Sequence, residues 1–313
     1  MSEPILIVQD LHKSFGEIKA VRGISLQVAQ GELFGLLGPN GAGKTTTLSM
    51  LTGLLSPDRG RITMKGLDFR THTHQLKARM GLVPQELALY PALSARQNLT
   101  FFGRIYGLKG RDLRRRVDEV LEMIGLTGRA DDPVETYSGG MKRRVNIGAG
   151  LLHKPDILFL DEPTVGVDPQ SRNAILESVE ALNRAGVTVI YTTHYMEEAQ
   201  RLCHRVAIVD EGQIIALDTP TALIRSLGGG LIVVGLAGEA AETVTDRLRS
   251  LPAVQGVQRR DGKLHIRARH TQEALVGLLE VANRLDLLIT TLEILEPNLE
   301  AVFLHLTGRR LRE

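Results

Sequence analysis

Five short apolar runs in the first two thirds of the chain have the length and composition of buried β-strands. Longer stretches with helical spacing lie between several of them. This alternation predicts an α/β fold around a mostly parallel sheet, and such sheets bind ligands in the crevice beyond the carboxyl ends of their strands. The runs are Leu33–Leu37, Met80–Val83, Ile157–Leu160, Val187–Thr192 and Val206–Val209.

The strand pattern fades between Gln85 and about Leu152. Helical patterns dominate this region, including Arg96–Tyr106 and Arg111–Ile124. We therefore expect a helical subdomain, at about residues 86–152, inserted into the α/β domain.

A glycine-rich linker, Gly228-Gly229-Gly230, follows Leu227 and marks a second domain. We predict domains at residues 1–227 and 231–313. The order βαββαβ in the tail is typical of a small ferredoxin-like α+β domain, and Asp261-Gly262 is a strong hairpin signal. The predicted elements are strand Leu231–Leu236, helix Glu239–Leu251, strands Val254–Arg259 and Lys263–Arg269, helix Thr271–Leu285, strand Leu287–Leu292 and a last helix from Asn298.

The charge balance argues against a dedicated nucleic-acid binder. The 313 residues include 38 basic and 36 acidic side chains, for a formal net charge of +2, and we expect no nucleic-acid partner. The densest basic run, Arg111–Arg116, is followed by Asp118, Glu119 and Glu122 at helical spacings. This pattern favours a solvated helix face with internal ion pairs, and the alternative is a contact with phosphate or lipid headgroups.

The single cysteine, Cys203, rules out an intramolecular disulfide and fits a reducing compartment. No segment approaches the roughly 18 uninterrupted apolar residues of a membrane span. The first residues also lack the basic-then-apolar layout of a signal peptide. We therefore expect a cytoplasmic protein that depends on a partner for any membrane role.

A phosphate-binding motif directly follows the apolar run Leu33–Leu37. It matches the pattern G-x-x-x-x-G-K-[ST] at every fixed position, and this predicts binding of a nucleoside triphosphate and Mg²⁺. Lys44 is expected to reach the β- and γ-phosphates, and Thr45 to offer its hydroxyl to Mg²⁺. The candidate nucleotide-binding residues of this loop are Gly38, Pro39, Asn40, Gly41, Ala42, Gly43, Lys44, Thr45 and Thr46.

Two adjacent carboxylates, Asp161 and Glu162, end the apolar run Ile157–Leu160. Adjacent residues at a strand end point to different sides, so the two can have different roles. We expect Asp161 beside Mg²⁺ and Glu162 facing the attacking water as general base or orienter.

Two further polar residues follow predicted strands. Gln85 could ligate Mg²⁺ or its water through the amide oxygen, and His194 could donate a hydrogen bond to the γ-phosphate and register its loss on hydrolysis. Because the carboxyl ends of parallel strands meet at one edge, a single crevice could collect the phosphate loop, Gln85, Asp161-Glu162 and His194.

Ser138-Gly139-Gly140 has the pattern of an N-cap and a glycine-lined helix start, which is a ready anion site. This second half-site has no Lys or Mg²⁺ ligand of its own. We therefore expect another molecule to complete it, and a symmetric dimer would do so.

In this order the motifs resemble the ATP-binding subunit of an ABC (ATP-binding cassette) transporter, a P-loop NTPase, from the start of the chain to about residue 225. The resemblance implies a Walker A loop at Gly38–Thr45, a Q-loop at Gln85 and a signature motif at Tyr137–Met141. It further implies Walker B at Ile157–Asp161 with Glu162 as catalytic base, a D-loop at Asp168 and a switch histidine at His194, with Lys44, Glu162 and His194 as the catalytic residues.

Three residues depart from the family pattern. Tyr137 and Met141 replace the usual Leu and Gln of the signature motif, although its Ser-Gly-Gly centre is intact. Phe15 stands where the family often has an adenine-stacking Tyr. Stacking needs only a π-face, so Phe15 is a candidate adenine contact, and the alternative is a Phe packed in the core.

The chain segment Glu296–Phe303, with Leu306-Thr307-Gly308 just after it, resembles the accessory tail of ATPases that serve ABC-2-type exporters of drugs, lipids or polysaccharides. The resemblance implies an ATPase on the inner face of the cell membrane that forms a head-to-tail homodimer around two ATP molecules. Its partner would be a membrane-spanning permease, contacted by the helical insert and the Gln85 loop. The alternatives are an importer ATPase and a soluble ABC ATPase acting on ribosomes or DNA.

Overall fold

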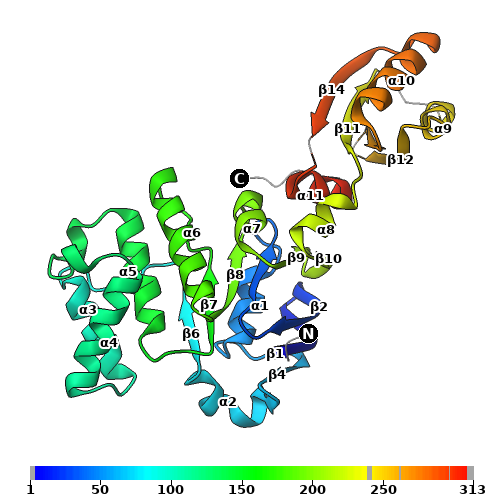
Figure 1. Ribbon diagram of the computed structural model, residues 1–313. Coiled ribbons are helices and arrows are strands. Elements are labelled where there is room, and N and C mark those ends of the chain that lie inside the picture. The colour runs from blue at the N-terminus through cyan, green and yellow to red at the C-terminus, as the bar shows by residue number, and fades with distance from the viewer. Residues whose placement is uncertain (1–3, 238–241, 261, 296, 309–313) are drawn as a thin grey trace. The chain divides into compact units, whose positions relative to one another are not determined.

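The computed structural model describes residues 4–237, 242–260, 262–295 and 297–308. The chain divides into two compact units, residues 1–214 and 215–313 (Figure 1). The predicted boundary at residues 227–231 stays a prediction. By the division into units, α8 (Pro220–Arg225) belongs with the second unit, where it packs on α11 (Leu299–Thr307). None of the described helices is long and apolar enough to cross a membrane.

The central sheet of the first unit has the strand order β10-β9-β3-β8-β7-β6. The pairs β3–β8, β3–β9, β6–β7 and β7–β8 are parallel, so the mostly parallel sheet is confirmed. Every residue of β3 and β7 is buried, which explains their uninterrupted apolar runs. The strands are β3 (Leu33–Leu37), β6 (Met80–Val83), β7 (Ile157–Asp161), β8 (Thr188–Thr193), β9 (Arg205–Asp210) and β10 (Gln213–Asp218).

A second sheet of the first unit, with the order β2-β1-β4-β5, is antiparallel and is missing from the sequence prediction. It comprises β1 (Pro4–Phe15), β2 (Ile18–Ala29), β4 (Arg59–Met64) and β5 (Leu67–Asp68). Register shifts interrupt the pairing of β1 with β2. A shift of one residue reverses which side chains face inward, so the apolar alternation on which a prediction rests is broken.

The predicted helical insert is present as α3 (Ala95–Ile105), α4 (Gly110–Met123) and α5 (Gly139–Leu151), with short 3₁₀ turns at Thr127–Arg129 and Val134–Thr136. Ser94 and Gln97 form a reciprocal capping box at the start of α3. The other helices of this unit are α1 (Lys44–Leu51), α2 (Phe69–Lys77), α6 (Pro169–Arg184) and α7 (Met196–Leu202).

Ion pairs of α4 agree with the solvated-face interpretation of the basic run. Arg115 pairs with Asp112 and Glu119, and Arg116 pairs with Glu119. Asp118 instead pairs with Arg96 of α3, across the interface between the two helices. The buried Arg116 guanidinium also donates to the carbonyl oxygens of residues 151 and 152, which ties α4 to the end of α5.

Cys203 is buried behind β3. A Cβ atom added at Gly35, in the middle of that strand, would lie 2.8 Å from the Cys203 Sγ atom. Burial raises the pKa of the Cys203 thiol far above its ordinary value. The thiol is therefore a packing group of the core, next to the strand that leads into the phosphate loop.

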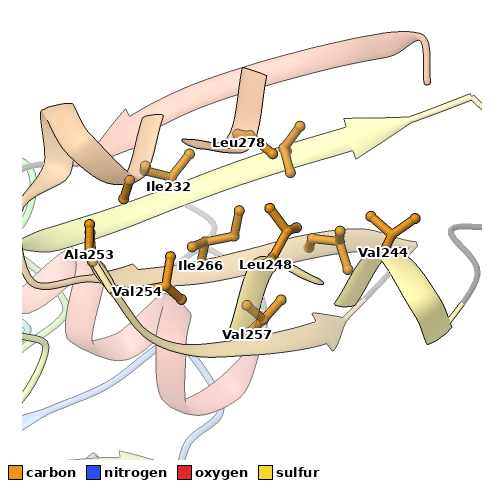
Figure 2. Close-up of a cluster of buried hydrophobic side chains, with 12 residues drawn as sticks. Ile232, Val244, Leu248, Ala253, Val254, Val257, Ile266 and Leu278 are labelled. Carbon is orange, nitrogen blue, oxygen red and sulfur yellow. The ribbon is translucent and has the colours of Figure 1, made fainter. Parts of the chain in front are cut away.

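The second unit has the predicted βαββαβ order and an antiparallel sheet, β12-β13-β11-β14. Helices α9 and α10 cover one face through side chains that converge from five elements, among them Ile232, Leu248, Ile266 and Leu278 (Figure 2). The elements are β11 (Gly230–Leu236), α9 (Glu242–Arg249), β12 (Val254–Arg260), β13 (Lys263–Ala268), α10 (Thr271–Arg284), β14 (Ile289–Leu295) and α11.

Two predicted elements in this unit have wrong bounds. The last strand begins at Ile289 and runs to Leu295, because residues 286 and 287 still form the turn after α10. Helix α9 ends at Arg249 and not at the predicted Leu251, and its predicted start at residues 239–241 lies outside the described residues. So do Asp261 of the predicted hairpin and Glu296 of the predicted tail motif. Asn298 caps α11 as expected, since its side chain accepts from the backbone N–H of Ala301.

Candidate functional site

The phosphate loop connects β3 to α1, and two of its glycines are required by close packing. A Cβ atom at Gly38 would lie 2.1 Å from the carbonyl oxygen of Val209. At Gly43, which caps α1 with φ 98°, a Cβ atom would lie 2.5 Å from the carbonyl oxygen of Ala20. Only glycine fits both positions, so the pattern of the motif follows from the fold as well as from the ligand.

A pocket of about 350 Å³ lies over this loop. Its walls come from the segments that follow β3, β6, β7 and β8, so the crevice expected at the carboxyl edge of the sheet is present. Residues lining the pocket are Ala20, Asn40, Gly41, Gly43, Lys44, Thr45, Thr46, Gln85, Glu162, Val165 and His194.

Lys44 and Glu162 form a buried ion pair on the pocket wall. The Lys44 Nζ atom donates to the carbonyl oxygens of Gly38 at 2.8 Å and Pro39 at 3.0 Å. It also lies 2.9 Å from the Glu162 Oε1 atom, and the two side chains are only 4% and 7% exposed. A phosphate that binds Lys44 must therefore compete with the Glu162 carboxylate.

The backbone of Glu162 has φ +43°, a left-handed conformation that is rare outside glycine. Thr192 of β8 holds it there, because the Glu162 N–H bonds to the Thr192 side chain at 2.9 Å and to its carbonyl at 3.2 Å. The other carboxylate oxygen of Glu162 lies 3.2 Å from the Nδ1 atom of His194. Glu162 is thus fixed between Lys44 and His194.

Asp161 and Thr45 place two oxygen donors together beside the pocket. The Asp161 Oδ1 atom accepts from the Thr45 hydroxyl at 3.2 Å and from the Thr192 hydroxyl at 2.6 Å. A hydroxyl and a carboxylate in contact, with the amide of Gln85 on the same pocket, fit the preference of Mg²⁺ for oxygen ligands. Within the described residues there is no cluster of three or more His, Cys, Asp or Glu side chains that could hold a metal by itself.

A buried carboxylate that sequence reasoning missed supports the His194 loop. Glu198 of α7 accepts from the hydroxyls of Tyr191 at 2.9 Å and Thr193 at 2.8 Å, and the Thr193 hydroxyl accepts from the N–H of Tyr195. Burial and the Glu198 charge raise the pKa of Tyr191 well above its ordinary value. Glu198 therefore holds Thr193 directly and Tyr195 through the Thr193 hydroxyl, and these two residues flank His194. No local sequence pattern identifies Glu198.

Four predicted site residues, Gly38, Pro39, Ala42 and Asp161, lie near lining residues in the chain but do not line the pocket themselves. Three further groups of predicted site residues do not line it either. Phe15, at the turn between β1 and β2, is 50% exposed, so the alternative of a core-packed Phe is wrong. Asp168 caps α6, and hydrogen bonds from Ser171 lower the pKa of its carboxyl. The third group, Ser138, Gly139 and Gly140, begins α5 as expected, with the Ser138 hydroxyl accepting from the Met141 N–H at 3.3 Å.

The signature segment keeps its polar face outward. Ser138 and Gly139 are exposed, whereas Tyr137 is buried and its hydroxyl donates to the Arg129 carbonyl. Tyr137 therefore fills the apolar position of the motif and leaves the helix start free to meet a ligand. Because this helix start is absent from the lining of the pocket in its own chain, it does not contribute to that site from within one molecule.

The sequence and the fold are similar to those of known proteins. Residues 21–165 match the family model "ABC transporter". The linearmycin resistance ATP-binding protein LnrL of Bacillus subtilis is 49% identical over 99% of this chain and 100% of its own length. The Nod factor export ATP-binding protein I of Ralstonia nicotianae is 41% identical over 100% of this chain and 96% of its own.

Among solved structures, an ATP-binding cassette in a dimeric post-hydrolysis state, bound to ADP and Pi, is 25% identical with a TM-score of 0.61. It covers 68% of this chain and 98% of its own. The two relatives match nearly the whole chain and so both units. The solved cassette matches 68% of the chain, which is about the size of the first unit. With a site of this geometry and relatives of this similarity, the chain belongs to the family of ATP-binding ATPases of ABC transporters.

Proposed function

We propose that this chain hydrolyses ATP as a homodimer and thereby powers export through a separate membrane-spanning permease. The observation that carries the proposal is the convergence of Lys44, Glu162, Gln85 and His194 on one pocket over the phosphate loop. Support for export comes from relatives named for antibiotic resistance and Nod factor export, which match the chain across both units.

In the binding step, the triphosphate lies on the phosphate loop, where backbone N–H groups and the start of α1 favour an anion. Lys44 exchanges its contact with Glu162 for one with the β- and γ-phosphates. Mg²⁺, held by Thr45 and Asp161 with Gln85 beside it, would neutralise phosphate charge when bound.

In the hydrolytic step, the exchange frees the Glu162 carboxylate to accept a proton from the attacking water. The fixed backbone at Thr192 keeps that carboxylate in place, so little reorganisation is needed at the moment of reaction. His194, next to Glu162, donates to the γ-phosphate and loses that partner when the phosphate leaves. The site then no longer favours the closed dimer.

Completion of the site by a second subunit follows from the exposed start of α5. Ser138 and Gly139, which are exposed, offer a hydroxyl, a backbone N–H group and a positive helix end. In a head-to-tail dimer, this helix start binds the γ-phosphate held by the partner subunit's phosphate loop. The solved cassette that is dimeric and bound to ADP and Pi supports a dimer as the working state.

The permease contact is proposed for the surface between the Gln85 loop and α3. Large apolar side chains are exposed there, namely Leu87, Tyr90 and Phe101, and the rings of Tyr90 and Phe101 meet edge to face at 4.9 Å. Exposed apolar patches of this kind mark interaction sites. A partner on this surface would lie next to Gln85 and so would sense the nucleotide pocket.

The test is a pull-down with tagged Glu162→Gln protein, ATP and Mg²⁺ from gently solubilised membranes, followed by mass spectrometry. Tagged Lys44→Ala protein is the matched control, because it should fail to bind ATP and so should not form the closed dimer. We expect a stoichiometric multi-span membrane protein with the Glu162→Gln variant. Recovery of ribosomal proteins or nucleic acid in its place would overturn the proposal of export.

A further inference from the structure

Arg143 lies in the second turn of α5, five residues after Ser138, and only 6% of it is exposed. Its guanidinium reaches two loops that line the nucleotide pocket of its own chain. The Nη1 atom donates to the carbonyl oxygens of Pro84 and Gln85, at 3.3 and 2.5 Å, and Nη2 donates to that of Val165 at 3.4 Å. One side chain therefore connects the helix that presents Ser138 to both pocket loops.

Asn146, one turn further along α5, adds a second connection to the same loop. Its Oδ1 atom accepts from the N–H of Ala88 at 3.2 Å, and its Nδ2 atom lies 3.5 Å from the carbonyl oxygens of Pro84 and Glu86. Arg143 and Asn146 are three residues apart, so they share one face of the helix. The first turns of α5 and the Gln85 loop are thus joined along several residues.

The far half of α5 is packed just as closely on the strand that precedes this loop. A Cβ atom at Gly81 of β6 would lie 2.3 Å from the carbonyl oxygen of Gly150 in α5. Backbone meets backbone there, and the helix cannot slide on the strand without a clash. Movement of the Gln85 loop must therefore be transmitted to α5 or must break the contacts of Arg143.

The energetics of Arg143 point to a role other than stability. Within the described residues no carboxylate lies within ion-pair distance of its guanidinium, and its partners are neutral carbonyl oxygens. Burial lowers the pKa of the guanidinium, which reflects the cost of holding a cation there. An apolar side chain would avoid that cost at the expense of the three hydrogen bonds to carbonyl oxygens, so the buried cation is weak evidence for a stabilising role.

We propose that Arg143 is a positioning residue that couples the two nucleotide sites of the dimer. It fixes the Gln85 loop and the Val165 loop of one site to the helix whose start, Ser138–Gly140, completes the other. ATP bound to the phosphate loop of one chain thereby sets the position of α5 in the same chain. The start of that helix contacts the ATP held by the partner subunit. This inference rests on the proposed function, since the second site exists only in the dimer.

The neighbouring Arg144 provides a matched control. It lies on the same helix, and burial lowers its pKa as well. Its Nη1 atom donates to the carbonyl oxygens of Ile124 and Gly125, which belong to the helical insert and not to the pocket. Loss of Arg144 should therefore cost packing within the insert without releasing the Gln85 loop.

The experiment compares Arg143→Met, Arg143→Lys and Arg144→Met in the full chain. ATP affinity is measured at protein concentrations that keep the chain monomeric, and kcat and the Hill coefficient for ATP are measured under dimer-forming conditions. For Arg143→Met we expect unchanged affinity, a kcat lower by roughly 10- to 100-fold from misplaced groups, and a Hill coefficient near 1. Arg143→Lys should recover part of both, and Arg144→Met should resemble the wild type. Equal kcat and Hill coefficients for Arg143→Met and Arg144→Met would overturn the proposal.

A second measurement needs neither dimer nor permease, so it separates failure of this inference from failure of the proposed function. The chain contains no tryptophan, and Glu135→Trp places one at an exposed residue just before the signature segment. In the monomer, ATP should change the fluorescence of this tryptophan when Arg143 is present and should not when Arg143→Met is added. A change of the same size in both proteins would overturn the coupling even if ATPase activity and export were established.

Discussion

The buried ion pair between Lys44 and Glu162 should hold ATP affinity below the value that the phosphate loop alone would give. The Nζ and Oε1 atoms are 2.9 Å apart, and both side chains are almost fully buried. At an effective dielectric constant of about 20, two unit charges at that distance attract by about 6 kcal/mol, part of which the cost of desolvation offsets. ATP must replace this contact before Lys44 can bind its phosphates.

Glu162→Gln removes the competing charge and keeps the shape of the side chain. Since a hydrogen bond to a charged group contributes about 1.5–3 kcal/mol, the variant should bind a non-hydrolysable ATP analogue roughly 10- to 150-fold more tightly. Calorimetric titration of the monomer measures this directly. Glu86→Gln, which removes an equal charge from an exposed residue of the Gln85 loop, controls for long-range electrostatics.

The same ion pair predicts that replacing Lys44 lowers the stability of the fold. Lys44→Met leaves the Glu162 carboxylate buried without its cation, which should lower the free energy of unfolding by about 3–5 kcal/mol. Adding Glu162→Gln should restore most of that loss, as a double-mutant cycle in urea would show. Equal analogue affinities for Glu162→Gln and Glu86→Gln, together with additive losses in the cycle, would refute the reasoning.

Three further predictions concern other parts of the chain. Gly38→Ala should abolish ATP binding in a titration, because its Cβ would lie 2.1 Å from the Val209 carbonyl, whereas Gly128→Ala, with open space around it, should bind normally. His194→Ala should keep ATP affinity and lower kcat by roughly 100-fold; a normal kcat would show that His194 is only a loop residue. Burial and nearby arginines lower the pKa of His305 from 6.5 to about 4. Protonation therefore favours the unfolded chain, and stability should fall between pH 7 and pH 5. His305→Gln should remove that loss in urea titrations at the two pH values.

The parallel strands and the pocket could be predicted because their signals are local. Strands β3 and β7 are buried on both faces and so appear as continuous apolar runs, and polar residues directly after them mark the edge where ligands bind. The antiparallel sheet could not be predicted in this way. Bulges and half-exposed faces in β1 and β2 blur their alternation.

The site was predictable in its residues but not in its contacts. Lys44 and Glu162 are far apart in the sequence, and their ion pair depends on how β3 and β7 are placed by β8 between them. Glu198 and Arg143 carry no motif of their own, since a buried polar residue in a helix has the same local pattern as an exposed one. Their importance follows only from the loops that tertiary packing brings to them. The assigned catalytic and binding roles stay predictions.

The buried position of Cys203 makes the rate of its chemical labelling a measure of how the core opens. The thiol is buried against β3, so a thiol reagent in solution can reach it only when the packing around it opens. When labelling is faster than reclosing, this single cysteine in the intact chain is labelled at the rate at which the core opens. When labelling is slower, its rate is proportional to the population of the open core. A nucleotide that binds the pocket should slow the labelling by the factor with which it stabilises the closed core. The ATPase can thus report ligand binding at equilibrium without any introduced probe.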